Sequence, residues 1–437
     1  MGKSSRTNCR KPEFSSRPAN RVAVSAALCC FALSAQSSDF SFGGHIKFGL
    51  ANTAYPDSSR FREWTGASTE DFTFGARLNL DWSKNSWDIR AEAQIEALGG
   101  DSIQISRNAG DNSALFAGLP NDDRRLFDLT RTIADKDGHA ALVRLDRLSF
   151  GYSGEKGVIR IGRQAFTWGN GLIFNTVMDI FNPFDPTALD KEYKPGDDML
   201  YGQYLRESGD DLQAVLVFRR DPATGEVKAD QSSFAAKYRG FSEAGEYDAL
   251  VASHYGESLI GFGGNRTVMG EVLWRGDFAA TFVDDGSVVP SAVTSLTHSF
   301  ELGGRNVIAA IEYHFNGFGQ RGGRYDAASL QSNRHLLTRI ARGELFNLGR
   351  HYLGLTATIE VSPLFLLTPN LFVNVEDRSA LLQLAARGDI GEEMLLLGSL
   401  NVPVGLTGTE FGGIASTTSD LPSSIGPSLS VQLSAYF

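Results

Sequence analysis

The last ten residues of the chain, 428–437, alternate between apolar and small or polar side chains. The apolar positions are Leu429, Val431, Leu433, Ala435 and Phe437. Because successive side chains of a β-strand point to opposite faces, this segment predicts a strand that is apolar on one face only. The edge of such a strand carries unpaired backbone groups, so we expect it to pair with another strand of the same chain.

The same period of two recurs through the chain, at 72–82, 87–97, 353–361 and 371–375. Charged side chains stand in the middle of these segments, on the face opposite the apolar residues. The charged residues that we expect to face the interior of the folded chain are Arg77, Asp88, Arg90, Glu92, Glu96, Glu312 and Glu360. Alternation alone does not say whether that interior face meets bulk water, as in a sandwich, or lines a lumen.

The composition is rich in apolar residues, at 42% hydrophobic with 29 Phe and 12 Tyr, yet no apolar run approaches 18 residues. The chain therefore cannot cross a membrane as helices. It can cross one as strands, since each strand needs only about ten residues of alternating character.

The spacing of the strands favours the membrane alternative. Short turns near 83–86, 153–157, 207–211, 242–245, 303–305 and 388–391 alternate with longer connections near 53–70, 99–140, 169–196, 220–230, 277–291, 317–348 and 403–427. Tight periplasmic turns and long outer loops are typical of a transmembrane β-barrel. Counting strands from residue 40 predicts a single all-β antiparallel barrel of about 18 strands, with 16 as the fallback because 257–264 and 267–276 carry the weakest pattern.

The first 35 residues have the features of a secretory signal peptide. Six basic residues precede a 12-residue apolar run, 22–33, and small and polar residues follow it. This order is typical of a cleaved leader, and the run is too short to span a bilayer. We therefore divide the chain into a signal peptide, 1–35, and a barrel, 36–437.

Removal of this leader changes the chemistry of the remaining chain. All three cysteines lie in the leader, which excludes a disulfide scaffold and a thiolate metal site from the rest. The leader also holds six of the 41 basic and one of the 51 acidic residues, so 35 basic and 50 acidic residues remain, a net charge of −15. An acidic surface of this kind disfavours nucleic acid as a partner.

The segment from Ile161 to Asp198 combines Gly, Pro, Asn and aromatic residues that do not form a regular lipid-facing strand. Loops of this length are usually functional or disordered. The stretch from about 157 to 205 resembles one found in poorly characterised porin-like outer-membrane proteins of Gram-negative bacteria, and the C-terminal strand resembles the closing strand of such barrels. The resemblance implies that loop 169–196 folds inward and narrows a channel. It also implies an outer-membrane location among lipid, with strand 428–437 as the segment bound by the barrel-assembly machinery.

An inward loop would bring basic and acidic groups face to face, the kind of transverse field that sorts solutes by charge. Its aromatic residues would offer an apolar surface to a sugar or an aromatic solute. The residues that we expect at such a constriction are Arg163, Trp168, Asn170, Asp185, Lys191, Tyr193, Lys194 and Asp197. The alternative is structural, with ion pairs and aromatic packing that fasten the loop to the wall. Arg163 shares its parity with Ile159 and Ile161, so a bulge near Gly162 is needed to turn it inward.

Enzyme and metal signatures are weak. Gly100–Ser102 and Gly151–Glu155 each match only part of a serine-hydrolase motif. The seven histidines show no paired ligand spacing, and the acidic turn Asp284–Gly286 lacks the ligand series of a calcium loop. We expect no catalytic residues, no metal and no cofactor.

The sequence therefore predicts an outer-membrane channel for passive diffusion of small hydrophilic solutes, with selectivity set by lumen charges and by loop 169–196. The acidic excess weakly favours cations. The alternatives are a barrel that exports a polysaccharide or takes up an apolar compound, a barrel hydrolase, and a soluble β protein. The oligomeric state and the identity of the solute stay open.

Overall fold

The structure is a computed structural model that describes residues 39–437 except 109–118, 137, 175–176, 324 and 416–420. The predicted signal peptide lies outside the described residues. Within the described part, four short helices accompany 19 strands. None of these helices is long and apolar enough to cross a membrane.

The helices are α1 (Arg60–Thr65), α2 (Ser102–Asn108), α3 (Ala327–Ser332) and α4 (Arg334–Ala341). The strands are β1 (Phe40–Ala54), β2 (Ser68–Lys84), β3 (Trp87–Gly100), β4 (Thr130–Lys136), β5 (His139–Ser153), β6 (Gly157–Gln164), β7 (Asp197–Leu205), β8 (Asp211–Val217), β9 (Ser233–Ser242), β10 (Gly245–His254), β11 (Glu257–Val268), β12 (Val272–Phe282), β13 (Val288–Leu302), β14 (Arg305–Phe315), β15 (His351–Ser362), β16 (Phe365–Asn374), β17 (Ser379–Asp389), β18 (Met394–Val404) and β19 (Ser428–Tyr436).

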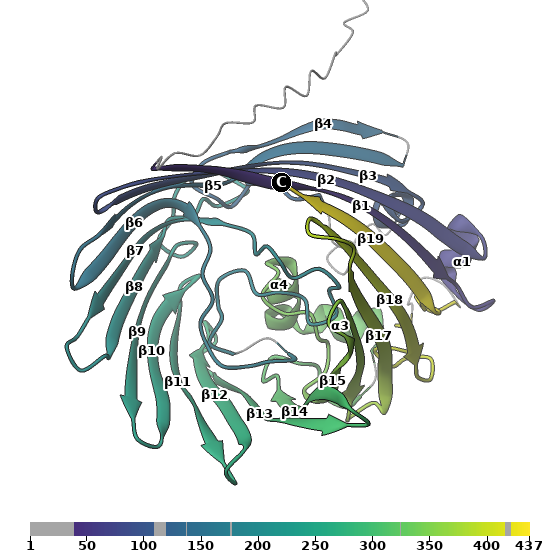
Figure 1. Cartoon of the computed structure of the whole chain (residues 1–437). Helices are drawn as coiled ribbons and strands as arrows, with labels where there is room; N and C mark the ends of the chain where they lie inside the picture. The colour runs from purple at the N-terminus through teal and green to yellow at the C-terminus, as the bar shows by residue number, and fades with distance from the viewer. Residues whose placement is uncertain (1–38, 109–118, 137, 175–176, 324, 416–420) are drawn as a thin grey trace, which may run out of the picture. The chain divides into compact units, whose positions relative to one another are not determined.

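The strands form one closed antiparallel barrel (Figure 1). Among the described strands, β4 pairs with β5 alone, while β5 also pairs with β3, so 18 strands make up the ring. This confirms the predicted fold class and the higher of the two strand numbers. The two weakly patterned segments are the full strands β11 and β12, so the fallback of 16 is wrong.

The barrel closes where β1 meets β19, with Leu50 opposite Val431. Beyond the end of β19, the amide of Phe437 donates to the carbonyl of Gly44 at 3.1 Å, and the amide of Gly44 donates to the carbonyl of Phe437 at 3.0 Å. A Cβ atom at Gly44 would lie only 2.1 Å from the carbonyl oxygen of Arg77 on β2, so glycine permits the close approach here. The C-terminal alternation therefore forms the seam of the ring.

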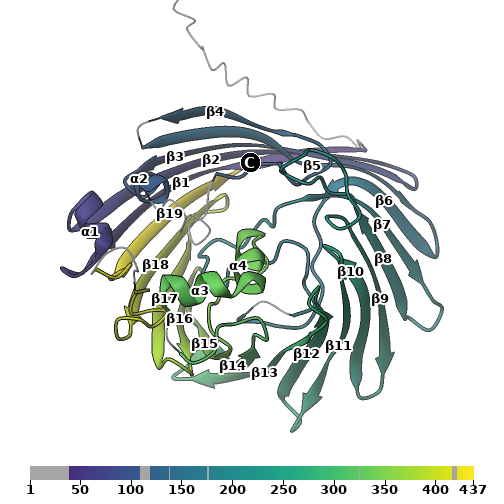
Figure 2. The same cartoon turned by 180° about the vertical axis from the view of Figure 1, so that it is seen from behind.

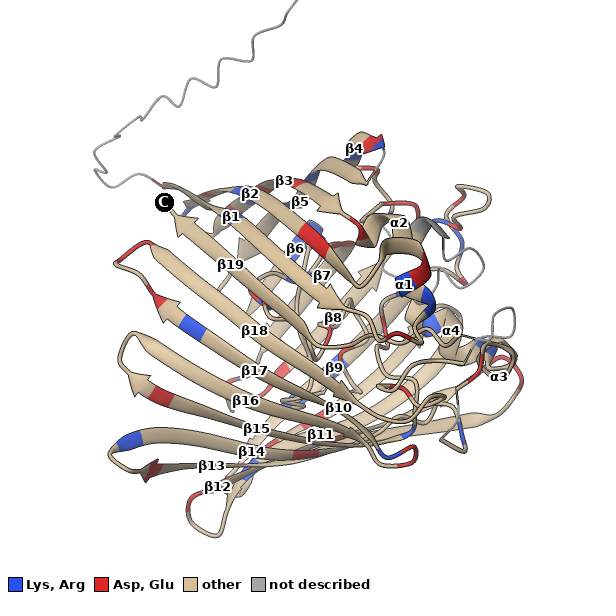
Figure 3. Ribbon diagram, turned by 90° about the vertical axis from the view of Figure 1, so that its right-hand side faces the viewer, with Lys and Arg blue, Asp and Glu red and all other residues tan. Residues whose placement is uncertain are grey.

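The outer surface of the ring is apolar. Its exposed side chains include Phe48, Leu50, Phe72, Ile159, Leu355 and Leu429. Most of the length of each strand in Figure 3 carries no charged residue. Charged strand residues such as Arg77, Asp248 and Glu312 are buried. This is the arrangement that a lipid environment selects, because a charge on the lipid face is costly near the bilayer midplane.

The two ends of the barrel differ. At the turn end, which also holds the C-terminus, neighbouring strands are joined by two to five residues, as at 85–86 and 206–210. At the loop end lie the longer connections 55–67, 101–138, 165–196, 218–232, 316–350 and 405–427, together with all four helices (Figure 3). The connection expected at 277–291 is only 283–287, because β12 and β13 extend further than their patterns predicted.

The two faces of β15 provide a test of the membrane-facing surface. Leu355 points outward, whereas its neighbour Thr356 faces the interior. We expect Leu355→Arg to lower the free energy of unfolding in lipid vesicles by ~2–4 kcal/mol, since a guanidinium near the midplane of the lipid face is poorly solvated.

Thr356→Arg is the matched control and should leave the unfolding free energy nearly unchanged. Denaturant titration followed by heat-modifiable gel migration measures both variants. Equal destabilisation by the two substitutions would contradict this assignment of the faces.

Candidate functional site

The connection between β6 and β7, residues 165–196, runs through the interior of the ring (Figure 1). We call it the lumen loop. Its contacts are with strands on opposite sides of the barrel, from β8 through β12 and β14 to β17, β19 and β1. Such contacts place a long segment without regular structure across the space that the strands enclose.

The first part of the lumen loop is fastened to the wall on the β8–β12 side. The indole Nε1 of Trp168 donates to Gln213 at 2.6 Å. The backbone amide of Asn170 donates to Asp277 at 2.6 Å, and its side-chain amide donates to the same carboxylate at 2.8 Å and to Asp248 at 3.2 Å. Hydrogen bonds to ionised acceptors are the stronger kind, so Asn170 is a firm attachment point.

Glu312 of β14 holds the next three residues. Its carboxylate accepts the backbone amides of Leu172, Ile173 and Phe174 at 2.7, 2.9 and 2.6 Å. The side chain is completely buried, and successive amides that converge on one carboxylate form a backbone anion site. Glu312, which the sequence predicts to face the lumen, is thus occupied by the lumen loop.

Apolar packing adds to these polar attachments. Trp168, Met178 and Phe181 of the lumen loop pack on the inner wall with Val215, Leu250, Leu259 and Ala279. Ile173 and Phe174 pack separately on Tyr352 and Phe372. An interior filled in this way is stabilised by apolar burial as well as by hydrogen bonds.

The second part of the lumen loop reaches the seam of the barrel. Lys47 of β1 forms ion pairs of 2.6 Å with both Asp190 and Glu192. Gln432 of β19 donates to Asp190 at 2.7 Å, and the hydroxyl of Tyr436 donates to Glu192 at 2.9 Å. The strands that close the ring therefore also hold the lumen loop.

Three of the predicted constriction residues, Arg163, Lys194 and Asp197, are buried within ion pairs. Arg163 has no exposed side-chain surface, and its guanidinium pairs with Asp122 and Asp198 at 2.9 Å. Lys194 pairs with Asp179 at 2.6 Å inside the lumen loop. Burial raises the pKa of Asp179 to about 6, although Lys194 acts against this shift. These groups hold segments of the chain together and do not face an open space.

Tyr193 lies beside the wall of β1 and β2, with its ring 4.0 Å from the guanidinium of Arg77. Arg77 itself is buried between Glu92 and Asp146. Asp197, the first residue of β7, forms an ion pair with Arg219. Asp185 caps its own turn by accepting the amide and hydroxyl of Thr187 at 2.8 and 2.7 Å.

The remaining charged residues expected in the lumen lie on inward-facing strand positions. Asp88 pairs with Arg160 at 3.3 Å, and Arg90 pairs with Asp81 at 2.7 Å. Glu96 accepts the side-chain amide of Gln94, and Glu360 accepts that of Asn306 at 2.8 Å.

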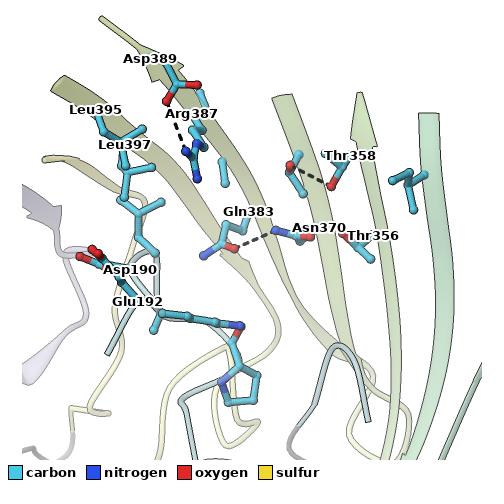
Figure 4. Close-up of a pocket in the computed structure, with 18 of the residues that line it drawn as sticks. Asp190, Glu192, Thr356, Thr358, Asn370, Gln383, Arg387, Asp389, Leu395 and Leu397 are labelled. Atoms are coloured by element: carbon cyan, nitrogen blue, oxygen red, sulfur yellow. Dashed lines mark hydrogen bonds and ion pairs between the residues drawn. The ribbon is translucent and has the colours of Figure 1, made fainter. Parts of the chain in front are cut away.

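A cavity of about 860 Å³ lies between the lumen loop and the wall of β14–β18, on the side toward the turn end (Figure 4). Hydroxyl and amide side chains of β15–β17 line part of its wall: Thr356, Thr358, Thr368, Asn370 and Gln383. Apolar side chains such as Phe372 and Leu397 line other parts. Lys191 lies on the opposite side, and its amino group donates to the carbonyl of Pro186 at 2.7 Å. Burial lowers the pKa of Lys191.

The sequence did not single out this hydroxyl and amide wall. The alternation at 353–361 places Thr356 and Thr358 on the face opposite the apolar residues, but neutral polar side chains resemble those of any solvated strand. Charged and aromatic residues gave the stronger signal. In the structure, some of them hold the lumen loop, as Glu312 and Trp168 do, and others pair with neighbouring residues, as Arg163 and Asp88 do.

Glu257, Asp284 and His335 bring their possible metal-ligand atoms within 4.8 Å of one another at the loop end. Arg339 pairs with Glu257 and Arg334 pairs with Asp284, so both carboxylates already have cationic partners. This arrangement differs from a dedicated cation site, and we assign no metal to it.

The long loops at the loop end meet at Glu410. Its carboxylate accepts the amide of Leu348 at 2.9 Å, the hydroxyl of Tyr352 at 2.6 Å and the side-chain amide of Asn374 at 2.8 Å. Burial raises the pKa of Glu410 from 4.5 to about 7. In the view along the barrel, α3 and α4 lie inside the outline of the ring (Figure 2). Since both helices belong to the connection 316–350, which contains Leu348, this carboxyl group helps to hold them at the loop end.

A raised folded-state pKa means that the folded protein binds the proton of Glu410 more tightly than the unfolded chain does. Its contribution to stability is therefore complete below pH about 4.5 and is lost as the pH rises through about 7. We expect Glu410→Gln to remove this part of the pH dependence of the thermal midpoint, measured by heat-modifiable migration. Glu207→Gln, at an exposed turn, is the control and should follow the wild type at every pH.

Comparisons with known proteins agree on the fold. No family model and no curated protein matches the sequence. Solved structures that share the fold include Wzi of Escherichia coli, described as a carbohydrate-binding β-barrel involved in Group 1 capsule assembly (11% identity, TM-score 0.50, 92% of this chain and 85% of that one). A BenF-like porin of Pseudomonas fluorescens is 8% identical, with a TM-score of 0.50 over 91% of this chain and 98% of that one. OccK9 of Pseudomonas aeruginosa is 9% identical, with a TM-score of 0.51 over 91% of this chain and 98% of that one. These likenesses show that the chain shares the fold of porin-like outer-membrane β-barrels.

Proposed function

We propose that the protein is an outer-membrane channel through which small hydrophilic solutes diffuse, and that the lumen loop narrows its passage. The observation that carries the proposal is the cavity of about 860 Å³ inside an 18-stranded ring, with hydroxyl and amide groups of β15–β17 on one wall. A barrel of this size encloses more space than its wall side chains fill. The contacts of the lumen loop with opposite walls support a narrow and selective passage rather than a wide one.

The charges around this cavity favour cations. Its acidic lining residues are Asp190, Glu192, Asp389, Glu392 and Glu393, and its basic ones are Lys191 and Arg387. An excess of one sign at a pore mouth raises the local concentration of ions of the opposite sign. The solute path along β15–β18 would therefore combine neutral hydrogen-bonding groups with an acidic end.

Conductance tests the channel and the role of the lumen loop together. In planar bilayers we expect stable current steps from the folded wild-type barrel. Lys47→Met should increase the conductance, because Asp190 and Glu192 lose the cation that holds them to β1. Lys156→Met removes an exposed ion pair with Glu207 at a turn and should leave the conductance unchanged.

Absence of current from a barrel that retains heat-modifiable migration would refute the channel. If current flows but Lys47→Met behaves like Lys156→Met, the channel stands and the proposed role of the lumen loop does not.

Ion preference is measured by the reversal potential in a salt gradient. We expect the wild type to prefer cations and the double variant Glu392→Gln with Glu393→Gln to lose part of that preference. Glu207→Gln is the matched control at another turn. An anion-selective wild type would contradict the proposed role of the acidic end.

A carbohydrate-binding barrel is the second candidate. The observation in its favour is the row of Thr356, Asn370 and Gln383, since hydroxyl and amide groups can hydrogen-bond to sugars. In the bilayer experiment, an oligosaccharide that blocks the current reversibly would indicate such binding. Strand 428–437 remains our proposed segment for the barrel-assembly machinery.

A further inference from the structure

A second pocket, of about 320 Å³, lies at the loop end among five outer connections, one of which is the β10–β11 turn with Tyr255. Its lining comes from segment 121–125, from the lumen loop near Asn182, from the connection after β8, and from the segment that follows α4. The residues of interest here are Arg124, Arg125, Arg219, Tyr255 and Arg342. The cavity of the proposed passage has a different lining, with none of these residues.

Basic groups outnumber acidic ones in this pocket. Four arginines face two aspartates, Asp123 and Asp197. Asp197 is already paired with Arg219, and Arg125 is paired with Asp122 behind the pocket. Asp123 is exposed to solvent, where its charge is well screened.

Two of the four guanidinium groups are therefore left without full compensation. Among the described residues, the side chain of Arg124 has no ion pair or hydrogen bond. The Nε of Arg342 is buried without a hydrogen-bond partner, and the carboxylate of Glu344 lies 3.8 Å from its Nη1. The carboxylate of Glu344 also lies within hydrogen-bond distance of His254, at 3.2 Å, so it interacts with two side chains and not with Arg342 alone.

The aromatic ring of Tyr255 orients two of these groups. The guanidinium of Arg342 lies 3.8 Å from the ring centroid, and that of Arg219 lies 4.6 Å from it. Stacking on an aromatic ring restricts a planar guanidinium and leaves its N–H edge free to donate. Burial lowers the pKa of Arg342, and the nearby charges of Arg124 and Arg339 lower it further, although Glu344 acts against the shift.

We propose that this pocket binds the oxyanion group of a small acidic molecule, a carboxylate or a phosphate, with Arg124 and Arg342 as its ligands. A guanidinium presents its donors in a fork that matches both kinds of oxyanion. The bound anion satisfies the buried Nε of Arg342 and relieves the repulsion between the two cations. Such binding does not require the barrel to conduct, so it can succeed or fail separately from the proposed channel.

The experiment is isothermal titration calorimetry at low salt, with the full-length barrel in detergent and with acetate or inorganic phosphate as the probe. We expect saturable binding of at least one probe to the wild type. Arg124→Gln and Arg342→Gln should each weaken that binding by about tenfold or more, since each removes a charge-assisted donor.

Arg334→Gln is the matched control. Arg334 also belongs to the α4 segment, but its side chain is exposed and pairs with Asp284 outside the pocket, so the affinity should match the wild type. Heat-modifiable migration verifies that each variant is folded, and Arg124→Gln removes no side-chain hydrogen bond or ion pair among the described residues. The two probes separate carboxylate from phosphate recognition. The proposal is overturned if neither probe binds the wild type, or if the folded Arg124 and Arg342 variants bind as the wild type does.

Discussion

Backbone pairing in lipid is the constraint on which the rest of this structure depends. A strand within a bilayer has no water to satisfy its amides and carbonyls, so the sheet must close on itself. Closure is achieved by β1 and β19, and their inner faces carry Lys47 and Gln432, which hold Asp190 of the lumen loop. The seam therefore connects the integrity of the barrel wall with the organisation of its interior.

The interior illustrates how a long irregular segment can be stable without regular secondary structure. Its backbone amides must find acceptors, and the single carboxylate of Glu312 accepts hydrogen bonds from three of these amides. Apolar residues on either side pack against the wall, while Lys194 and Asp179 pair within the segment. The wall and the lumen loop thus share polar and apolar contacts, and a cavity of about 860 Å³ lies between them on the β14–β18 side.

The alternating pattern predicted the fold class and the strand number because inside and outside of a barrel differ at every second residue. Even the weak segments at 257–264 and 267–276 became β11 and β12. The candidate site was harder to predict. Arg163 and Lys194 were predicted to line a constriction, and in the structure both are buried in ion pairs. A charged residue that pairs within the chain cannot be distinguished by sequence from one that binds a solute.

By itself, the sequence determined a one-sided strand at the C-terminus, an apolar outer face, inward charges and an irregular segment too rich in Gly, Pro and aromatic residues to lie in lipid. These are local properties, set by residue type and by the period of two. Only the tertiary structure decided which charges are neutralised and which groups border open space, because ion pairs such as Lys47 with Asp190 join residues 143 positions apart. It also decided that Arg124 and Arg342 meet beside Tyr255, since their proximity arises from the packing of separate outer loops.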